Sequence, residues 1–280
     1  MNDLYQSVTD RIITALESGK LPPWVKPWAS VGGMPRNAVS GRHYSGTNAL
    51  LLWLNDYADP RYLTYKQAQA VGANVRKGEH GSPIVFFKPL TVTDKKTDEL
   101  KTIPMLRGFT VFNVSQIEKL PDEFTAPIPV STHTAHALAD SVLSQAVIEH
   151  GHGKACYIPS RDMIHLPEAV TFKTPETYYA TALHELTHWS GHESRLCRKL
   201  STRFGDASYA AEELIAELGS AFLCAELGID GQLQHECYLD AWLKIMKADK
   251  RAIFTASRHA REAHEFLTGK RQVEEVKEAA

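Results

Sequence analysis

The chain has 280 residues, 43% of them hydrophobic, which is enough for one large hydrophobic core or two modest ones. No run of eighteen apolar residues occurs, which excludes a membrane-spanning helix, and the acidic residues of the amphipathic N-terminal segment exclude a signal peptide. We therefore expect a cytoplasmic protein with no membrane partner. No C-x-x-C pair occurs among the cysteines, which are expected to be reduced core thiols. They are Cys156, Cys197, Cys224 and Cys237.

The formal net charge of −2 hides an uneven distribution of charged residues. Residues 1–130 carry 15 Lys and Arg against 12 Asp and Glu, whereas residues 131–280 carry 16 against 21. The basic excess is largest over residues 20–92, with nine basic and three acidic residues. The stretch "LPDEFTAPIPVST", with three prolines and no helical period, is typical of a linker. We place a domain boundary there, between domains 1–128 and 129–280.

The first domain is predicted to be a small α+β unit. Helices are expected first, and two strands follow, joined by the hairpin tip "TDKKTDEL". The segment before the second helix is too rich in Pro and Gly for regular structure. In chain order we expect a helix over 3–18, an irregular segment over 19–46, helices over 47–58 and 64–71, and strands over 82–92 and 102–114.

Basic and aromatic residues alternate in this first domain. Single-stranded nucleic acid is held by this combination, because bases stack on rings while cations follow the phosphates. For Trp24 and Trp28, packing in a small core is the competing interpretation. We expect DNA affinity to lie almost entirely in this domain, since the second is net acidic. The candidate DNA-binding residues are Trp24, Lys26, Trp28, Arg36, Arg42, Tyr44, Lys66, Arg76, Lys77 and Lys88.

Residues 181–192, "TALHELTHWSGH", contain the H-E-x-x-H spacing of zinc peptidases. On a helix, His184 and His188 lie one turn apart on the same face, where two imidazoles can occupy adjacent corners of a tetrahedral zinc site. Glu185 then stands beside them, where a carboxylate can take a proton from a metal-bound water. The pattern therefore predicts a metal site and favours a catalytic one.

The flanking sequence supports this interpretation. Residues 157–167, "YIPSRDMIHLP", predict one or two short strands. A helix follows, with Thr174 as its N-cap and Pro175 at its first position. Zinc peptidases hold an extended substrate along a strand beside the metal-binding helix, so this order of elements fits the motif.

A third metal ligand is expected from the helical run over 211–228. There, Glu213 and Glu217 form an E-x-x-A-E pattern among apolar residues, so their carboxylates should face something charged. We predict that Glu213 binds the metal and that Glu217 hydrogen-bonds a ligating histidine. Glu212 is expected to be exposed. Two histidines and a glutamate suit one divalent ion, with Zn²⁺ favoured and Mn²⁺, iron or cobalt as alternatives.

Other groups near the motif are less favoured or stay open. Ser194 occupies the place of the third histidine in the longer H-E-x-x-H-x-x-G-x-x-H pattern, which excludes that branch of peptidases. His192 is a poor ligand candidate because Gly191 is predicted to end the helix. The group that would stabilise an oxyanion is undecided among four residues. These are Tyr178, Tyr179, Tyr209 and His259.

Taken together, the motifs resemble a known family over nearly the whole chain. The segments that carry the likeness are "LPPWVKPW", "GRHYSGTNALLLW", "YLTYKQAQAVGANVRKGEHG", "LRGFTVFNVSQIE", "YYATALHELTHWSGHESRL" and "EELIAELGSAFLCAELG". They resemble plasmid antirestriction proteins of the ArdC type, whose N-terminal module is also similar to one in some conjugative-plasmid primases. The resemblance implies an N-terminal single-stranded DNA-binding domain and a C-terminal, mostly helical zincin-like metallopeptidase domain. It also implies that the protein shields incoming plasmid DNA from host restriction during conjugation.

Three hypotheses follow. The first is an antirestriction protein that binds single-stranded DNA and carries a metallopeptidase-like domain. The second is a DNA-localised zinc metalloprotease that cleaves a host or plasmid protein. The third is a binding module whose metal is structural, and the presence of Glu185 argues against it, because a structural site has no use for a base.

Overall fold

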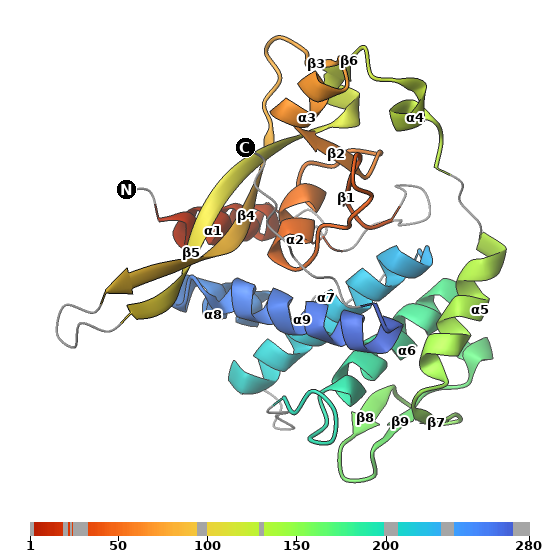
Figure 1. Cartoon of the computed structure of the whole chain (residues 1–280). Helices are drawn as coiled ribbons and strands as arrows, with labels where there is room; N and C mark the ends of the chain where they lie inside the picture. Colours follow the sequence, from red (N-terminus) through yellow and green to blue (C-terminus); the bar gives the residue numbers. More distant parts are fainter. Residues whose placement is uncertain are drawn as a thin grey trace.

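The computed structural model of the chain describes residues 3–18, 22, 24, 33–93, 100–128, 132–198, 207–230 and 238–270. It has two domains with mixed α and β content, as predicted (Figure 1). The N-terminal half combines helices with a four-stranded sheet, and the C-terminal half is mostly helical with a three-stranded sheet. Within the described residues, no helix is both long and apolar enough to cross a bilayer.

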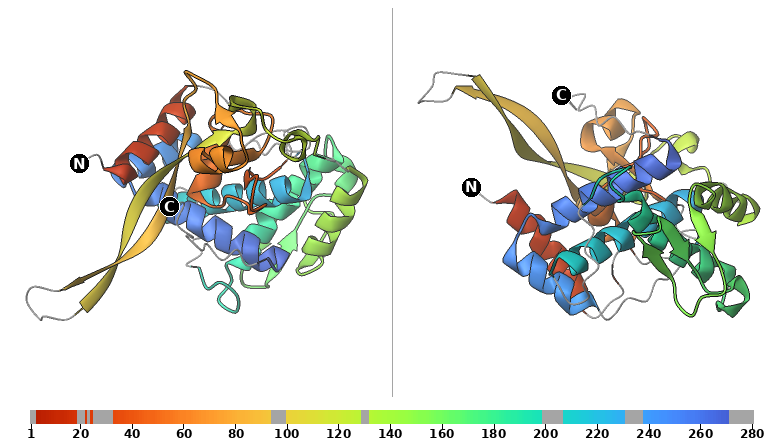
Figure 2. Two further views of the ribbon diagram at one scale, coloured as in Figure 1. Left: turned by 45° about the horizontal axis from the view of Figure 1, so that its top comes forward. Right: turned by 90° about the horizontal axis from the view of Figure 1, so that it is seen from below.

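In the N-terminal half, the larger sheet has the strand order β1-β2-β5-β4, and β3 pairs with β6. The antiparallel β4–β5 hairpin projects from the body of the molecule (Figures 1 and 2). The elements are α1 (Leu4–Glu17), β1 (Arg36–Asn37), α2 (Thr47–Trp53), β2 (Arg61–Thr64), α3 (Tyr65–Ala70), β3 (Asn74–Val75), β4 (Ser82–Thr93), β5 (Leu100–Asn113), η1 (Val114–Gln116), β6 (Ile117–Glu118) and α4 (Asp122–Thr125).

Most of the predicted N-terminal elements are confirmed, with three differences. The segment 19–46, predicted to be irregular, contains the short strand β1, which pairs with β2. Helix α2 ends at Trp53 rather than at residue 58, because Asp56 adopts a φ of 57°, a left-handed conformation that a helix cannot contain. The predicted linker contains the one-turn helix α4 and is therefore not wholly irregular. Helix α1 begins where expected, since the Asp3 carboxylate accepts a hydrogen bond from the Tyr5 backbone N–H.

The C-terminal half places two long helices, α6 and α7, against each other, with α9 packed on both. Its small sheet has the order β7-β9-β8, which leaves β8 at an edge. The elements are α5 (Thr132–Leu143), β7 (Val147–Glu149), β8 (Cys156–Ile158), β9 (Met163–His165), η2 (Ala169–Thr171), α6 (Pro175–Ser190), α7 (Ala207–Leu227), α8 (Leu239–Ala248) and α9 (Ala252–Thr268).

One hydrophobic core joins the two halves. Ile12 of α1 and Leu50 of α2 are fully buried in the same cluster as Phe222 of α7. Trp24 packs on Trp242 of α8, with ring centroids 6.1 Å apart. Burying a large apolar side chain stabilises the fold by roughly 1.5–3 kcal/mol. Either half alone would lose this burial, so functional tests require the full chain.

The described cysteines are free thiols, as predicted. Cys224 is buried and Cys156 is half-buried, but Cys197 is exposed and follows the helix α6 in a turn with a φ of 50°. The prediction that all four are core residues was therefore wrong for Cys197. Cys237 lies outside the described residues.

Candidate metal centre and nucleic-acid interface

Helix α6 carries the H-E-x-x-H motif as the spacing predicts. The Thr174 hydroxyl accepts a hydrogen bond from the Thr177 backbone N–H, Pro175 is the first helical residue, and the helix ends before Gly191. His184 and His188 lie on one face, with ring centroids 4.9 Å apart. His184 is buried and His188 is mostly buried, with 13% of its side chain exposed, so the sequence places two imidazoles on the same inward face.

Helix α7 crosses α6 and brings Glu213 to these imidazoles. The Nε2 atom of His184 lies 3.5 Å from one Glu213 carboxylate oxygen, and the Nε2 atom of His188 lies 3.4 Å from the other. One ligand atom from each of the three side chains lies within 4.8 Å of those of the other two. Two imidazole nitrogens and a carboxylate that converge in this way form a donor set that fits a divalent metal ion.

Each histidine is also held through its second ring nitrogen. The Nδ1 atom of His184 lies 3.6 Å from a Glu217 oxygen, and the Nδ1 atom of His188 lies 3.3 Å from a Glu212 oxygen. A carboxylate at Nδ1 keeps the proton there and leaves the Nε2 lone pair facing the centre. Glu217 thus lies where it was predicted to lie, beside a histidine of the motif.

Glu212 is not exposed, which corrects the prediction. Only 5% of its surface is accessible, and its Oε1 accepts a hydrogen bond of 2.9 Å from Arg198 Nη2. Arg198 also donates to the backbone oxygen of Thr187 and to the Ser190 hydroxyl. The sequence did not predict that Glu212 contacts His188 or that Arg198 contacts Glu212. No pattern in the sequence between Arg198 and α7 indicates that the two residues lie together.

The charges of the centre balance one another. Burial alone would lower the pKa of His184, but its contacts with Glu213 and Glu217 outweigh burial and raise that pKa to about 10. Burial acts in the opposite sense on Glu213, where contacts with His184 and His188 hold the carboxyl pKa well below its usual range. The carboxylates therefore favour protonated imidazoles when no ion is bound, and metal binding would displace those protons.

Glu185 is fixed beside the two histidines by the edge strand β8. Its Oε2 accepts a 2.7 Å hydrogen bond from the Tyr157 backbone N–H, and 8% of the residue is accessible. His184 and His188 face Glu213, whereas Glu185 faces β8 and does not belong to the cluster of His184, His188 and Glu213. This position suits a proton acceptor rather than a metal ligand.

Of the four candidates for oxyanion stabilisation, Tyr209 lies beside a proposed metal ligand. Tyr209 lies on α7 beside Glu213, and burial together with the neighbouring Tyr238 and Glu213 raises its pKa, so its hydroxyl stays protonated. The other three candidates are engaged elsewhere. Tyr178 contacts His150, Tyr179 donates to Asp140, and His259 contacts Glu262.

The close approach of α6 and α7 depends on Gly219. A Cβ atom at this position would lie 2.5 Å from the Thr187 methyl carbon and 2.9 Å from its hydroxyl, and Thr187 is fully buried. Gly219→Ala should therefore push the helices apart, at a cost of about 1–3 kcal/mol. We expect a lower melting temperature and weaker metal binding, measured by calorimetry. Gly228→Ala is the control. A Cβ there, just after α7, meets nothing within 4 Å, so the substitution strains only the local backbone. Equal metal affinity in wild type and Gly219→Ala would contradict the expectation.

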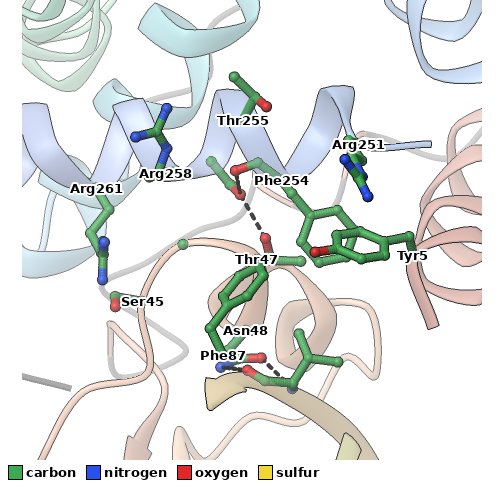
Figure 3. A pocket seen from close by; sticks show the side chains of 13 residues that line it. Tyr5, Ser45, Thr47, Asn48, Phe87, Arg251, Phe254, Thr255, Arg258 and Arg261 are labelled. Atoms are coloured by element: carbon green, nitrogen blue, oxygen red, sulfur yellow. Dashed lines mark hydrogen bonds between the residues drawn. The ribbon is translucent and has the colours of Figure 1, made fainter. Parts of the chain in front are cut away.

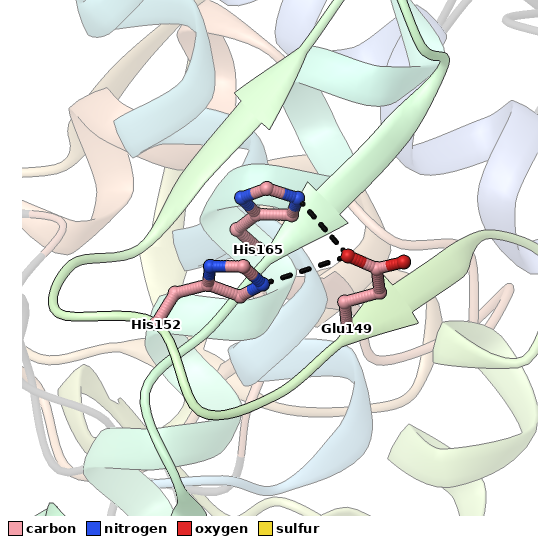
Figure 4. A group of neighbouring side chains, drawn as sticks. All are labelled: Glu149, His152 and His165. Atoms are coloured by element: carbon pink, nitrogen blue, oxygen red, sulfur yellow. Dashed lines mark ion pairs between the residues drawn. The ribbon is translucent and has the colours of Figure 1, made fainter.

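A second group of metal-type ligands lies on the small sheet (Figure 4). Glu149, His152 and His165 approach one another, with both His Nε2 atoms facing one Glu149 oxygen at 3.6 and 3.3 Å. The two rings stack nearly parallel, with an interplanar angle of 6°. Because the rings lie in parallel planes with centroids 3.6 Å apart, one ion cannot lie in the plane of both rings, so this cluster is a poorer ion site than the centre on α6 and α7.

Two of the predicted DNA-binding aromatic residues are core residues. Trp24 is 1% exposed and Tyr44 is 8% exposed. Trp24 packs on Trp242, and Tyr44 lies edge-on to Tyr62. Their rings have no free face for a base, which corrects both assignments. Trp28 and Lys26 lie outside the described residues.

Several of the predicted basic residues do lie at the surface. Arg42, Lys66 and Lys77 are exposed, and Arg36 in β1 is half-buried. Arg76 is exposed but pairs with Glu79 at 2.8 Å. Lys88 lies in β4. The α3–β3 region thus presents positive charge.

Comparison with known proteins gives the family. Residues 2–112 match the N-terminal domain of the anti-restriction factor ArdC, and residues 135–259 match a zincin-like metallopeptidase domain. The crystal structure of the metal-free ArdC antirestriction protein from plasmid R388 is 42% identical and superposes with a TM-score of 0.82, over 96% of this chain and 98% of that one. The chain belongs to the ArdC antirestriction family. The Mn(II)-bound structure of that ArdC protein, 40% identical with a TM-score of 0.79 over the same shares of both chains, supports a divalent metal in this family.

ArdC-type sequences also occur within longer proteins. Two proteins named DNA primase TraC from Escherichia coli are 41% and 38% identical over 94% and 97% of this chain. The chain spans only 27% and 20% of their length. An uncharacterized protein of Sinorhizobium fredii (strain NBRC 101917 / NGR234), y4eC, is 37% identical over 95% of this chain and 91% of its own length. The family suggests a DNA partner.

Proposed function

We propose that this protein binds single-stranded DNA and protects incoming plasmid DNA from host restriction during conjugation, acting in the cytoplasm. The observation that carries the proposal is the exposed basic surface of the N-terminal domain, in a chain of the ArdC family. Lys66 and Lys77 are exposed on it, and cations of this kind follow the phosphates of a strand.

For the C-terminal domain we propose one divalent ion held by His184, His188 and Glu213. Two imidazoles and a carboxylate favour Zn²⁺, with Mn²⁺ as the alternative. When bound, such an ion supplies Lewis acidity and lowers the pKa of a bound water. Glu217 and Glu212 hold the imidazoles in the required orientation.

A second candidate function, hydrolysis of a host or plasmid protein, is favoured by the position of Glu185. Its carboxylate is held by β8 beside the proposed ligands, where it could accept a proton from a nucleophile and pass it to a leaving amine. The strand β8 lies at an edge of its sheet, and the protonated hydroxyl of Tyr209 lies beside Glu213. These features support a peptidase mechanism without naming its substrate.

The test compares DNA binding and protection in two variants. A triple replacement of Arg42, Lys66 and Lys77 by Gln should weaken binding of single strands and reduce the log–log salt slope by about 0.7 for each lost contact. Glu185→Gln should leave DNA binding unchanged. We measure fluorescence anisotropy with single-stranded and duplex oligonucleotides, and the survival of conjugated plasmid in a restricting host.

The matched control replaces three exposed basic residues of the C-terminal domain, Lys154, Arg161 and Lys173, by Gln. It removes the same charge but should leave both affinity and protection intact. Protection that is lost in Glu185→Gln and kept in the N-terminal triple variant would reverse the order of the two functions. Equal affinity for single strands and duplex would contradict the preference for single strands.

A further inference from the structure

A pocket of about 230 Å³ lies where the two halves meet (Figure 3). One wall is α9 of the C-terminal domain, and the others come from α1, the start of α2 and β4. Its aromatic lining is Tyr5, Phe87 and Phe254, and its basic lining is Arg251, Arg258 and Arg261. The pocket thus combines rings and guanidinium groups drawn from both domains.

The aromatic side of the pocket includes a ring that is open to solvent. Phe87 is 46% exposed, which is unusual for so large an apolar side chain. Tyr5 lies between Phe87 and Phe254, with ring centroids 6.4 and 4.8 Å away. Tyr5 and Phe254 pack on each other, and the exposed part of the Phe87 ring is a surface on which a base can stack.

The basic side of the pocket is one face of α9. Residues 251, 258 and 261 are seven and three positions apart, so their side chains emerge on the same side of the helix. The Arg251 guanidinium lies 5.1 Å from the centre of the Tyr5 ring. Arg258 is more than half exposed and lies 3.5 Å from Glu262, while Arg261 lies 3.9 Å from Glu265. The Arg251 guanidinium beside the Tyr5 ring and the exposed Arg258 guanidinium thus bring positive charge to the pocket.

The pocket is preformed because its walls are tied together. The Asn48 side chain exchanges two 2.8 Å hydrogen bonds with the backbone of Val85 in β4. The Thr47 and Ser257 hydroxyls lie 2.7 Å apart and connect α2 to α9. Gly46 adopts a φ of 54° in the wall and approaches the Ser257 backbone oxygen. Binding therefore needs little rearrangement of the two domains.

We propose that this pocket holds one nucleotide of a single-stranded DNA, with the base stacked on Phe87 and the phosphate bound by Arg251 and Arg258. The proposal rests on the proposed function and adds to it a site on the DNA path. It departs from the expectation that DNA affinity lies almost entirely in the first domain. Arg251 precedes α9 and Arg258 lies in it, so both arginines belong to the C-terminal domain.

The test uses the full metal-loaded chain and a fluorescein-labelled oligo-dT. Phe87→Ala should weaken binding roughly 5- to 150-fold, the range for one lost stacking contact, whereas Phe87→Trp should retain it. Arg258→Gln should reduce the log–log salt slope by about 0.7. Leu138→Ala, which removes an equally exposed apolar side chain from α5, and Arg161→Gln, which removes the same charge outside the pocket, should bind as wild type does.

A second readout locates the base directly. Photocrosslinking of an oligonucleotide containing 5-iodo-deoxyuridine should label the peptides that contain Phe87 or Tyr5. If wild type binds DNA but Phe87→Ala and Arg258→Gln bind equally well, or if crosslinks form only elsewhere, the pocket is not on the DNA path. A wild-type chain that binds no single strand would instead overturn the proposed function itself.

Discussion

Replacing His188 by alanine is expected to abolish stoichiometric metal binding. The imidazole contributes one of three converging ligand atoms, and Glu213 would lose one of its two partners in the centre. An ion present at a thousand times its dissociation constant stabilises the fold by about 4 kcal/mol, and that contribution would disappear. Elemental analysis of the purified chain and its melting temperature, with and without chelator, measure the effect.

Two further variants divide the roles within the motif. Glu213→Gln should also lose the ion, because the amide is a weaker ligand than the carboxylate. Glu185→Gln should keep it, since Glu185 faces Tyr157 and not the ligand cluster. Metal content that is unchanged in His188→Ala or Glu213→Gln would remove that residue from the ligand set. Loss of metal in Glu185→Gln would show that the proposed base is a ligand instead.

The second large effect is acid destabilisation through His264 of α9. This side chain is 3% exposed, and within the described chain its Nε2 has no hydrogen-bond partner. Burial lowers its pKa to about 4, from the usual 6.5 of a histidine. Between about pH 6.5 and pH 4, His264 is protonated in the unfolded chain but neutral in the folded chain. The free energy of unfolding therefore decreases as the pH falls through this range. The total loss from this group is about 3 kcal/mol.

Chemical denaturation at a series of pH values tests this expectation. His264→Leu keeps the volume and removes the titrating ring, so its stability should fall less than that of wild type between pH 6.5 and 4. At pH 7 the variant should be as stable as wild type or more so, because a buried polar atom without a partner has been removed. Parallel pH profiles of the two proteins would mean that His264 is not the group responsible.

The sequence was most informative where a short spacing fixes a geometry. Histidines four apart on a helix must share a face, so their arrangement on α6 followed from the motif and its N-cap at Thr174. Glu213 was predicted because a carboxylate among apolar residues needs a charged neighbour. The α+β class followed from the order of periodic segments.

The failures have a common physical cause. Burial of an aromatic or acidic side chain depends on what packs against it from distant parts of the chain. Trp24 belongs to a core that it shares with Trp242, and Glu212 is buried by Arg198 and His188. A basic, aromatic composition describes both a DNA-binding surface and such a core equally well. The pocket on α9 escaped notice for the same reason, since its residues come from both ends of the chain.

The joint core also bears on how such proteins are rearranged by recombination. A gene fusion that carried only the N-terminal domain would leave Ile12, Leu50 and Trp24 without the helices that cover them. In the Escherichia coli primases named TraC, the aligned region takes 94% and 97% of this chain and not one half of it. In these relatives the two domains therefore occur together, as expected if each half depends on the other to cover its core.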